Sequence, residues 1–531
     1  MELPWMFFGL SPTTVLLIGI VLVLCYLYST WNFSTFKKMG IPGPPPWPII
    51  GNMQSSKGIQ HKEQEWIKEY GKVFGTYEGR QPVINFADPE ICKQITVKHF
   101  SSFVNRRVLP LNGKPMNSGL TVLVDDQWKR ARNTLTPAFS GAKMRMMAPL
   151  INQCANELVA NMETYCKEEK VAQCKDLYGG FVVDSIASAG FGLDVSSQSQ
   201  PGHPFVENAK LAFKFSLFSP VFVVVFFFPF LVPLLNLFDV QLFPKKVLDY
   251  FVGVTEDAIE MRKPGRDSSN RIDFLQLMVN AHEVYDQHMA NKDKEIDEDE
   301  GENKVDFVKD GPSSQVKLQK GFTKDEMLAQ SLLFFLAGYE TTSTLMSFVS
   351  YSLATNPEVQ NKLHSEIDDI MSDSDDDDDI GYETLKKMTY LDMVVTETLR
   401  MYPPAIRFDR ECNEDVNISG VSIPKGMIVA VSIYAIHHDP EIYPEPEKFI
   451  PERFTKEEKE KRHPYAWIPF GAGPRNCIGM RFALMEAKIG LVRVLQKFTF
   501  EPCAETEIPP KLGKLGFLTP PNGIKLSVKR R

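Results

Sequence analysis

The segment from Phe470 to Gly479, with the sequence FGAGPRNCIG, constrains this chain more than any other feature. It places one cysteine, Cys477, in a stretch of glycine and proline directly before a predicted helix from about residue 480 to 495. Glycines let the backbone approach a large flat ligand and direct N–H groups toward sulfur. A helix N-terminus favours the thiolate over the thiol, and a thiolate can be an axial ligand of haem iron. An isolated cysteine is more often a small buried hydrophobic residue, but this context favours the ligand.

The composition excludes several broad classes of protein. The chain has 531 residues, of which 43% are hydrophobic and 24% charged, so it has ample apolar surface for a large core and is not mainly disordered. Its net charge of −8 is not the basic balance that nucleic-acid binding usually needs. Its eight cysteines are too few for a disulfide scaffold, and none forms a CxxC or CxxxC pair, which argues against a zinc ribbon or an iron–sulfur cluster.

Two acidic runs, at 295–302 and 373–379, hold much of the negative charge. Runs of like charge are usually solvated, so we expect both to be surface loops. A calcium or partner site is the alternative. Calcium loops need interleaved glycine and carbonyl ligands, which the aspartate run lacks.

An apolar segment near the N-terminus predicts a membrane anchor. Residues 10–28 carry no charge, and a helix of this length spans about 28 Å, close to the hydrocarbon thickness of a bilayer. Lys37 and Lys38 follow it, and bulky aromatic residues stand where a cleavage site needs small ones. We therefore expect an uncleaved single-pass anchor over 1–36, with the remainder of the chain cytoplasmic. The basic, proline-rich stretch 37–48 predicts a stiff linker, with an SH3 ligand as the alternative.

A second apolar run, at 217–243, is interrupted by Pro220, Pro229 and Pro233. These prolines argue against a second continuous membrane span. We expect a patch that dips into the bilayer surface, with burial in the core as the alternative.

Most of the other long segments have the periodicity of helices. Residues 72–77 and 83–86 predict a β-hairpin, and residues 427–434 predict a further strand. The predicted fold class is therefore mainly α with a minor β-sheet region.

The segment 470–479 resembles the haem-binding loop of the cytochrome P-450 family. The positions that match are Phe470, Gly471, Gly473, Arg475, Cys477 and Gly479. The resemblance implies haem b as the cofactor, with the Cys477 thiolate as axial ligand of the iron and Arg475 as a partner of a haem propionate. It also implies one large cytochrome P-450 fold, so we expect a single catalytic domain over residues 49–531.

Further motifs of the family occur in the expected order. Glu397 and Arg400 are similar to its ExxR element, and a spacing of three places both side chains on one face of a helix. Residues 451–454 resemble the downstream partner of that element, in which Arg453 completes a Glu–Arg–Arg cluster. We expect this cluster to be structural; without the other motifs, the pair would be an ordinary ion pair. His437 and His438 are expected to be structural surface residues.

Trp128 and Arg132 resemble the WxxxR motif of the family. One helical turn separates them, so an indole N–H and a guanidinium can both reach a propionate. The resemblance implies further propionate contacts from Arg106 and Arg410, and the alternative for each is a surface base.

Residues 337–342 are similar to the oxygen-binding stretch of the central helix of the family. A capping-box pattern at 323–326 predicts where this helix begins, and we expect it to run to about Ala354. A threonine in it can bond back to the i−4 carbonyl and bend the helix. The resemblance implies that Thr341 and Glu340 help to deliver protons to bound dioxygen; the alternative is a threonine packed in the core.

The likeness is greatest to family 3, the drug- and steroid-oxidising group. It implies a haem-thiolate monooxygenase of the endoplasmic reticulum membrane that hydroxylates lipophilic substrates with O2 and with electrons from NADPH through cytochrome P-450 reductase. Cytochrome b5 is a further candidate partner, and nucleic acid is not expected. Lys129 and Arg130 are expected to face the reductase, with a solvated basic face as the alternative. By family position, the substrate pocket is expected to include Leu109, Thr121, Leu336, Ala337, Ala405 and Phe517.

Two other functions stay open. A haem-thiolate isomerase that acts on lipid peroxides needs no reductase, and such enzymes typically lack the oxygen-side threonine that this chain has at Thr341. A non-catalytic haem-binding sensor would need Cys477 but not Thr341. A membrane scaffold without haem explains none of the motifs.

Overall fold

The computed structural model describes residues 11–53, 58–107, 113–200, 202–213, 220–238, 240–262, 273–299, 321–372, 379–513 and 517–531. Leu109 lies outside the described residues, as do 300–302 and 373–378 of the two acidic runs. The fold is mainly helical with small sheets, as the sequence predicted.

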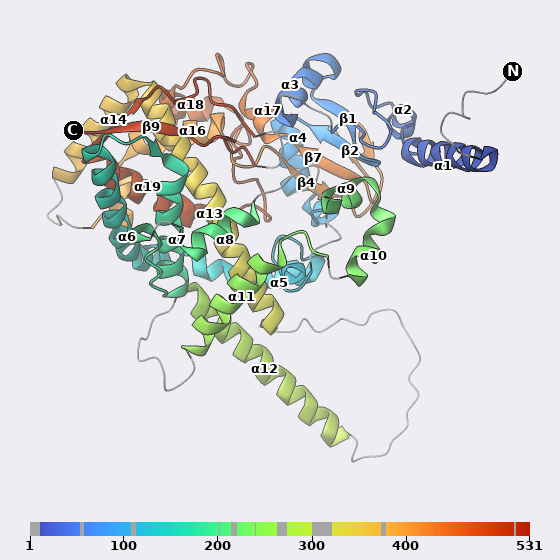
Figure 1. Ribbon diagram of the computed structural model, residues 1–531, viewed down its shortest axis with the longest axis horizontal. Helices are drawn as coiled ribbons and strands as arrows, with labels where there is room; N and C mark the ends of the chain where they lie inside the picture. Colours follow the sequence, from blue (N-terminus) through green and yellow to red (C-terminus); the bar gives the residue numbers. More distant parts are fainter. Residues whose placement is uncertain are drawn as a thin grey trace.

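Long helices form the centre of the molecule (Figure 1). They are α6 (Gly141–Lys167), α7 (Cys174–Phe191), α13 (Lys324–Thr355), α16 (Thr389–Met401) and α19 (Met480–Leu495). Helix α13, the longest, packs against α7, α16 and α19, and α6 packs against α7 and α19. The expected capping box is present at the start of α13, because Thr323 and Glu326 each accept a hydrogen bond from the other's backbone N–H. The helix after Cys477 also has the predicted bounds.

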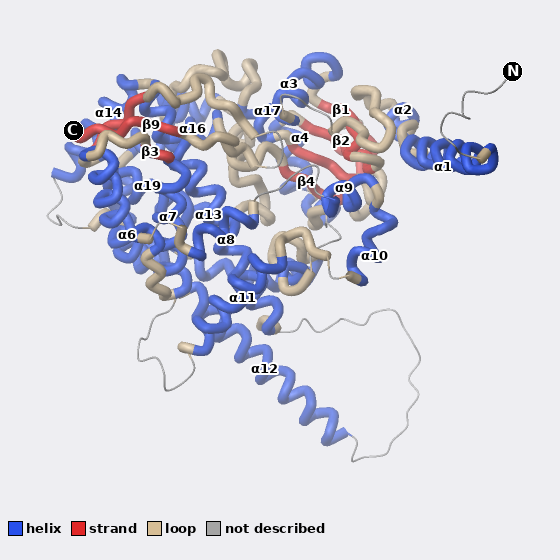
Figure 2. The backbone as a smooth tube through the Cα atoms, in the orientation of Figure 1, coloured by secondary structure: helices blue, strands red, loops and turns tan. Residues whose placement is uncertain are grey.

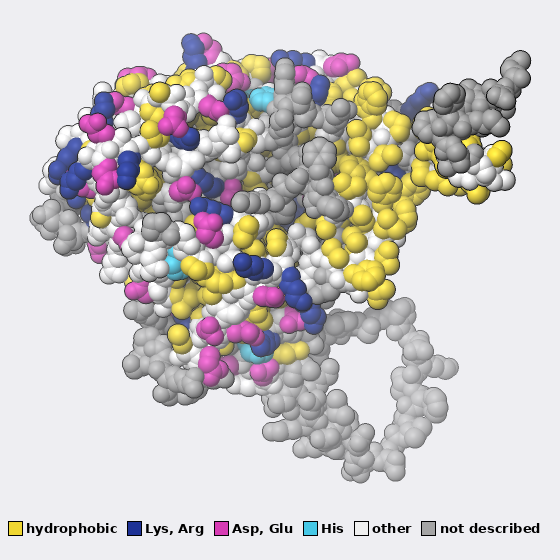
Figure 3. All heavy atoms as spheres, in the orientation of Figure 1, with side chains coloured by type: hydrophobic (Ala, Val, Ile, Leu, Met, Phe, Trp, Pro, Cys, Tyr) yellow, Lys and Arg dark blue, Asp and Glu magenta, His cyan; other side chains and the backbone are white. Residues whose placement is uncertain are grey.

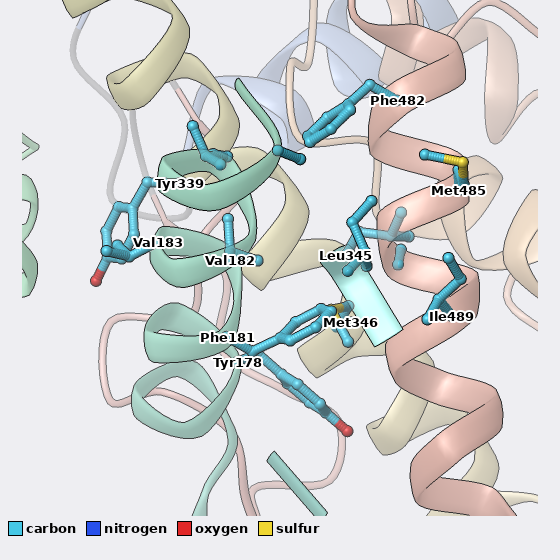
Figure 4. Packing of buried hydrophobic residues seen from close by; sticks show 14 of the residues in the cluster. Tyr178, Phe181, Val182, Val183, Tyr339, Leu345, Met346, Phe482, Met485 and Ile489 are labelled. Atoms are coloured by element: carbon cyan, nitrogen blue, oxygen red, sulfur yellow. The ribbon is translucent and has the colours of Figure 1, made fainter. Parts of the chain in front are cut away.

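Close packing between α7, α13 and α19 fixes the position of the central helix (Figure 4). A Cβ atom added at Gly490 of α19 would lie 2.7 Å from the Met346 Cε atom and 2.8 Å from the Phe181 ring, so only glycine allows this approach. Helix α13 is apolar and long enough to cross a membrane, but 72% of its most apolar window is buried inside the protein. It is therefore the core helix of the domain.

The strands form separate sheets at opposite sides of the helical centre (Figure 2). In the larger sheet the order is β1–β2–β7–β4, with β2 and β7 parallel and the other pairs antiparallel. The predicted hairpin is present, as β1 (Val73–Glu78) and β2 (Gln81–Phe86). The strand expected over 427–434 is shorter, because β7 (Ile428–Val431) is followed at once by α17 (Ile433–His437). The other strands are β4 (Phe408–Glu411), β5 (Val416–Ile418) paired with β6 (Val421–Ile423), and a three-stranded sheet of β3 (Ala172–Gln173), β9 (Lys525–Arg530) and β8 (Phe498–Pro502).

The N-terminal helix α1 (Pro12–Thr30) stands at one edge of the molecule (Figure 1). With α2 (Thr35–Met39) it forms an apolar segment whose most apolar window has a mean hydropathy of 2.1 and is 6% buried, as suits a membrane anchor. Its last turn contacts the catalytic body: the Arg80 guanidinium lies 3.6 Å from the centre of the Tyr28 ring, and the Phe230 ring meets Tyr28 edge-on at 5.4 Å.

The second apolar run forms short helices rather than a continuous span, as its prolines predicted. These are α9 (Pro220–Phe227), η7 (Pro229–Leu231) and α10 (Val232–Leu237). Phe230, Leu234, Leu237 and Phe238 are exposed, and Figure 3 shows an apolar surface on this side of the molecule, next to α1. The anchor and this apolar surface therefore lie on the same side.

One acidic run differs from its expected form. We expected 295–302 to be a loop, but residues 295–299 form the end of α12 (Phe274–Asp299), which projects from the body (Figure 1). The glutamate and lysine residues of this stretch are good helix formers, so the helix continues into the charged run.

Short helices and turns connect these parts. They are α3 (Ile59–Tyr70), α4 (Pro89–Lys93), η2 (Gln94–Lys98), η3 (Phe100–Phe103), η4 (Met116–Ser118), α5 (Asp125–Leu135), η5 (Thr136–Phe139), η6 (Ser197–Ser199), α8 (Pro204–Ala212), α11 (Lys245–Glu260), α14 (Pro357–Ser372), α15 (Tyr382–Lys387), η8 (Pro451–Phe454) and α18 (Lys456–Lys461).

Candidate active site

A cavity of about 630 Å³ lies between the larger sheet, α13 and the Cys477 loop. Its walls are mainly apolar, and it collects eleven of the site residues that the sequence suggested. These are Arg106, Thr121, Trp128, Arg132, Ala337, Thr341, Ala405, Arg410, Arg475, Cys477 and Phe517. Segments more than 400 residues apart in the chain therefore meet at one place.

Two suggested residues do not line this cavity. Leu336 was expected in the substrate pocket, but it is buried in the hydrophobic core and does not line the cavity. Glu340 is also buried and is absent from the cavity wall, although the next residue, Thr341, lines it. Successive residues of a helix point about 100° apart, so the two side chains leave α13 in different directions.

Backbone geometry holds Cys477 at the cavity. The Cys477 N–H donates to the Phe470 carbonyl at 2.9 Å, which closes the loop. At Gly473, φ is +71° and a Cβ atom would lie 1.9 Å from the Thr96 carbonyl oxygen, so glycine is required. Burial in the protein raises the pKa of the Cys477 thiol, and the backbone N–H groups of Gly479 and Met480 act against this rise. These N–H groups at the start of α19 are the donors that favour a thiolate.

Guanidinium groups crowd the cavity wall near Cys477. Burial lowers the pKa of Arg106, Arg410 and Arg475, and mutual repulsion lowers it further for Arg410 and Arg475. The Nε atoms of Arg106 and Arg410 are buried, and neither has a hydrogen-bond partner among the described residues. Because a guanidinium stays charged near neutral pH, this cluster requires anionic oxygens.

The other two suggested propionate contacts border the same cluster. Arg132 donates to the backbone oxygen and to the Oδ1 atom of Asn476, each at 2.8 Å. The Arg475 guanidinium lies 4.7 Å from the centre of the Trp128 ring. A flat ligand with two carboxylates and a metal that accepts thiolate therefore fits this end of the cavity, and haem b has these features.

A second charged cluster braces the wall behind the loop. Arg400 is bidentate to Glu397 at 2.7 and 2.8 Å, and Arg453 approaches the same carboxylate at 3.4 Å. Arg400 also donates to the carbonyl of His437 at 2.9 Å. All of these groups are buried.

The two histidines are not surface residues. His437 and His438 are buried, and burial lowers the pKa of both rings. The His437 Nε2 atom accepts a hydrogen bond at 2.9 Å from the N–H of Ile468, just before the haem-binding loop. The expectation of surface residues was wrong, because His437 ends α17 and His438 follows directly, and this helix was not predicted from the sequence.

The sequence did not suggest a third charged cluster on the cavity wall. Arg107 bridges Glu78 at 2.6 Å and Asp409 at 2.9 Å, and Arg407 is paired with Glu78 and with Glu63. The two guanidinium groups lower the pKa of Glu78 to about 2 despite its burial. Sequence gave no signal for this cluster, since its members come from separate parts of the chain.

Helix α13 carries the back-bonded threonine that the sequence suggested. The Thr341 hydroxyl donates to the Ala337 carbonyl at 2.7 Å. Gly338 lies beside it, and a Cβ atom there would come within 2.5 Å of the Ile186 Cδ1 atom, so a larger residue would require that side chain to move. Behind the helix, Glu340 pairs with Lys175 at 3.1 Å and accepts from the Thr519 hydroxyl at 2.9 Å.

A mainly helical fold in which a cysteine borders a cavity, beside arginines with unpartnered buried Nε atoms among the described residues, has the features of a haem-thiolate protein. Comparison with known families gives the particular one. Residues 41–300 and 280–528 match the sequence model of the family described as Cytochrome P450, and the chain belongs to this family. It is a cytochrome P450 monooxygenase, and its cofactor is haem with a cysteine thiolate as axial ligand.

Curated relatives extend the match over almost the whole chain. The chain is 43% identical over 525 residues to Cytochrome P450 3A9 of Rattus norvegicus, covering 98% of this chain and 97% of the relative. It is 41% identical to Cytochrome P450 3A29 of Sus scrofa over 526 residues, and 41% identical to Cytochrome P450 3A5 of Homo sapiens over 525 residues, with 98% of both chains covered each time. The likeness to the 3A group that the motifs suggested is confirmed.

Proposed function

We propose that this enzyme hydroxylates bulky lipophilic substrates, such as steroids and xenobiotics, with electrons from NADPH through cytochrome P-450 reductase. The observation that carries the proposal is the cavity itself, where Cys477, the arginine cluster and Thr341 border one mainly apolar space. An apolar cavity with few polar groups suits lipophilic molecules.

The residues of the chain have separable tasks in this proposal. Arg106, Arg132, Arg410 and Arg475, with the Trp128 indole, would hold the propionates of the haem. The haem supplies the oxygen activation when bound. The apolar wall, including Ala337, Ala405 and Phe517, orients the substrate and excludes water.

Thr341 takes part in proton delivery. Its hydroxyl proton is held by the Ala337 carbonyl, which leaves its oxygen lone pairs to accept from a water in the cavity. Glu340 delivers protons in this scheme only after its carboxylate leaves Lys175 and Thr519.

The proposed reductase surface needs one change. Lys129 is exposed and can meet an acidic partner, whereas Arg130 is paired with Glu326 and donates to the Gly321 carbonyl. We keep Lys129 in this role and leave Arg130 out of it. Cytochrome b5 remains a second candidate partner.

We further propose that the enzyme is held in the endoplasmic reticulum membrane by α1, with the catalytic domain over 49–531 on the cytoplasmic side. The exposed apolar side chains of η7 and α10 lie beside α1 and would rest on the same bilayer surface. Protease protection of tagged termini in microsomes tests the orientation, and a protected C-terminus would contradict it.

The test of function is NADPH-driven turnover in membranes with added reductase, with a panel of steroids and bulky drugs. We expect hydroxylated products from the parent and loss of product, or diversion to peroxide, in Thr341→Ala. If the thiolate-bound haem is present but an endoperoxide is converted without reductase, the isomerase is the right assignment. Haem binding without any turnover would favour the sensor.

A further inference from the structure

A buried carboxyl group on α19 has no role in the site described so far. Glu486 lies nine residues after Cys477 and is 0% exposed. Neither of its carboxyl oxygens has a hydrogen-bond partner within bonding geometry among the described residues. Buried polar groups are nearly always paired, so an unpaired carboxyl in a helical core requires an explanation.

The neighbour that matters is Thr342, on the facing side of α13. Its hydroxyl is close enough for hydrogen bonding to act on the pKa of Glu486, and its side chain is also part of the cavity wall. The Thr342 Oγ1 atom is itself buried without a partner in bonding geometry in the described part of the chain. A small rotation of either side chain, or one bridging water, is enough to join the two groups.

The surroundings of Glu486 keep it neutral. Burial raises its pKa well above the ordinary value, and the effect of Thr342 is the smaller, opposing one. The ionisable group that faces it from α6 is Cys154, and burial raises the pKa of that thiol to about 12, so it is neutral as well. No cation among the described residues contributes to the shift of Glu486, unlike Glu340, which has Lys175.

The two acids, Glu340 on α13 and Glu486 on α19, are therefore in opposite situations. Glu340 is paired with an ammonium group and is turned away from the cavity, which makes its carboxylate a poor proton source as it stands. Glu486 has no cationic partner among the described residues, and the Thr342 hydroxyl, on the cavity wall, is the group whose hydrogen bonding acts on its pKa.

We propose that Glu486 is a protonated acid that supplies a proton to the cavity through the Thr342 hydroxyl. When Thr342 Oγ1 gives its proton to an acceptor in the cavity, the Glu486 proton replaces it and a carboxylate remains. The reverse transfer, from cavity water through the same hydroxyl, restores the acid. Only O–H bonds break and form, and no electron moves.

The protonation state can be read without turnover. The holoenzyme is studied by infrared difference spectroscopy between Glu486→Gln and the parent, where a protonated carboxyl has a C=O band that a carboxylate lacks. We expect the parent to show this band at neutral pH and the variant to lose it. Glu157→Gln, a partly exposed acid on α6, is the matched control and should leave the band in place. A parent spectrum without the Glu486 band would overturn the proposal.

The transfer is tested by coupling, and this arm rests on the proposed function. We expect Glu486→Gln and Thr342→Val each to lower the share of NADPH electrons that reach product several-fold and to raise peroxide. The double variant should be no worse than either single one, since both lie on one path. Haem content and the melting temperature should stay at the parent level in Glu486→Gln, because the side chain loses no partner.

Each result separates the two ideas. A parent that forms no product from any substrate sinks the proposed function, while the infrared band and the peroxide yield still decide on Glu486. Unchanged coupling and peroxide yield in Glu486→Gln would rule out proton supply by this residue. A variant that loses haem or melts early would show a structural role instead.

Discussion

Two clusters of buried arginines lie on the two sides of the Cys477 loop, and they differ in one respect. In the cluster of Glu397, Arg400 and Arg453, one carboxylate faces both guanidinium groups, and backbone carbonyls accept from their terminal nitrogens. The Arg453 Nε atom has no hydrogen bond among the described residues, but it lies 3.4 Å from the Glu397 carboxylate. In the cluster of Arg106, Arg410 and Arg475, like charges face one another and buried donors are left over. The first, satisfied cluster contains its own carboxylate and is therefore structural. The second, unsatisfied cluster is explained by an anionic ligand.

The largest expected effect comes from breaking the satisfied cluster. Glu397→Ala leaves the buried Arg400 without its anion, and removing one partner of a buried pair costs about 3–5 kcal/mol of unfolding free energy. Denaturant unfolding of the holoenzyme, followed by circular dichroism and by haem absorbance, measures this cost. A loss below about 1 kcal/mol would mean that the cluster is not the brace that its geometry indicates.

A pH titration probes the third cluster, in which Glu78 on the cavity wall pairs with Arg107 and Arg407. The pKa of Glu78 is about 2 in the folded protein and 4.5 as a reference for the unfolded chain. Because the folded pKa is depressed, its contribution of about 3 kcal/mol is present above pH 4.5 and is lost as the pH falls toward 2. Unfolding free energies of the parent and Glu78→Gln should therefore converge as the pH falls through this window. Parallel curves would contradict the assignment.

Removing an arginine from the unsatisfied cluster should weaken haem binding rather than destabilise the fold. Arg410→Met removes a charged group whose buried Nε atom lacks a partner among the described residues, although its Nη1 atom donates to the neighbouring Asp409 carbonyl at 2.6 Å. We expect the haem-free protein to be no less stable, while haem binding weakens by about 1.5–3 kcal/mol, the usual value of a hydrogen bond to a charged group. Haem transfer to an acceptor protein and thermal melting of both forms measure the two effects. Arg145→Met, an exposed arginine paired with Glu383, is the control and should change neither. Equal destabilisation of both forms would place Arg410 with the structural cluster.

The smallest effect is expected where the same charges meet in water. Lys62 and Glu65 form an ion pair at 2.7 Å with side chains 38% and 50% exposed. Lys62→Ala should cost about 0.2–1 kcal/mol, because screening and side-chain entropy cancel most of the attraction. Chemical denaturation at low and high salt measures this loss of unfolding free energy. A loss near that of Glu397→Ala would mean that burial does not explain the difference between the buried and the exposed ion pair.

Local motifs predicted most of the site. The Cys477 loop, the start of α13 and the bounds of α19 follow from glycine, capping and proline patterns that act over a few residues. Arg106 and Arg410 followed only from the resemblance, since nothing local separates a propionate ligand from a surface base. In the structure both residues line the cavity and have buried Nε atoms without a partner among the described residues, so neither is a surface base, and their contact with a propionate stays a prediction.

Other expectations failed where the outcome depends on packing. Glu340 and Thr341 are neighbours in the sequence, yet only Thr341 lines the cavity, because the rotation of α13 against α7 decides which face is which. Glu486 was missed, although a lone acid among the apolar residues of a helix beginning just after the cysteine was a usable signal. His437 was expected at the surface, but it ends α17, a helix of five residues that was not predicted from the sequence, and it is buried there.

The sequence by itself determined the family, the thiolate ligand, the anchor and the mainly helical fold, because these depend on short patterns of glycine, charge and hydrophobicity. Only the tertiary structure decided which buried charges are paired and which are left for a ligand. Pairing depends on distances of a few ångströms between segments hundreds of residues apart, as between Arg107 and Asp409. The difference between a brace and a binding site is therefore a property of the packed molecule.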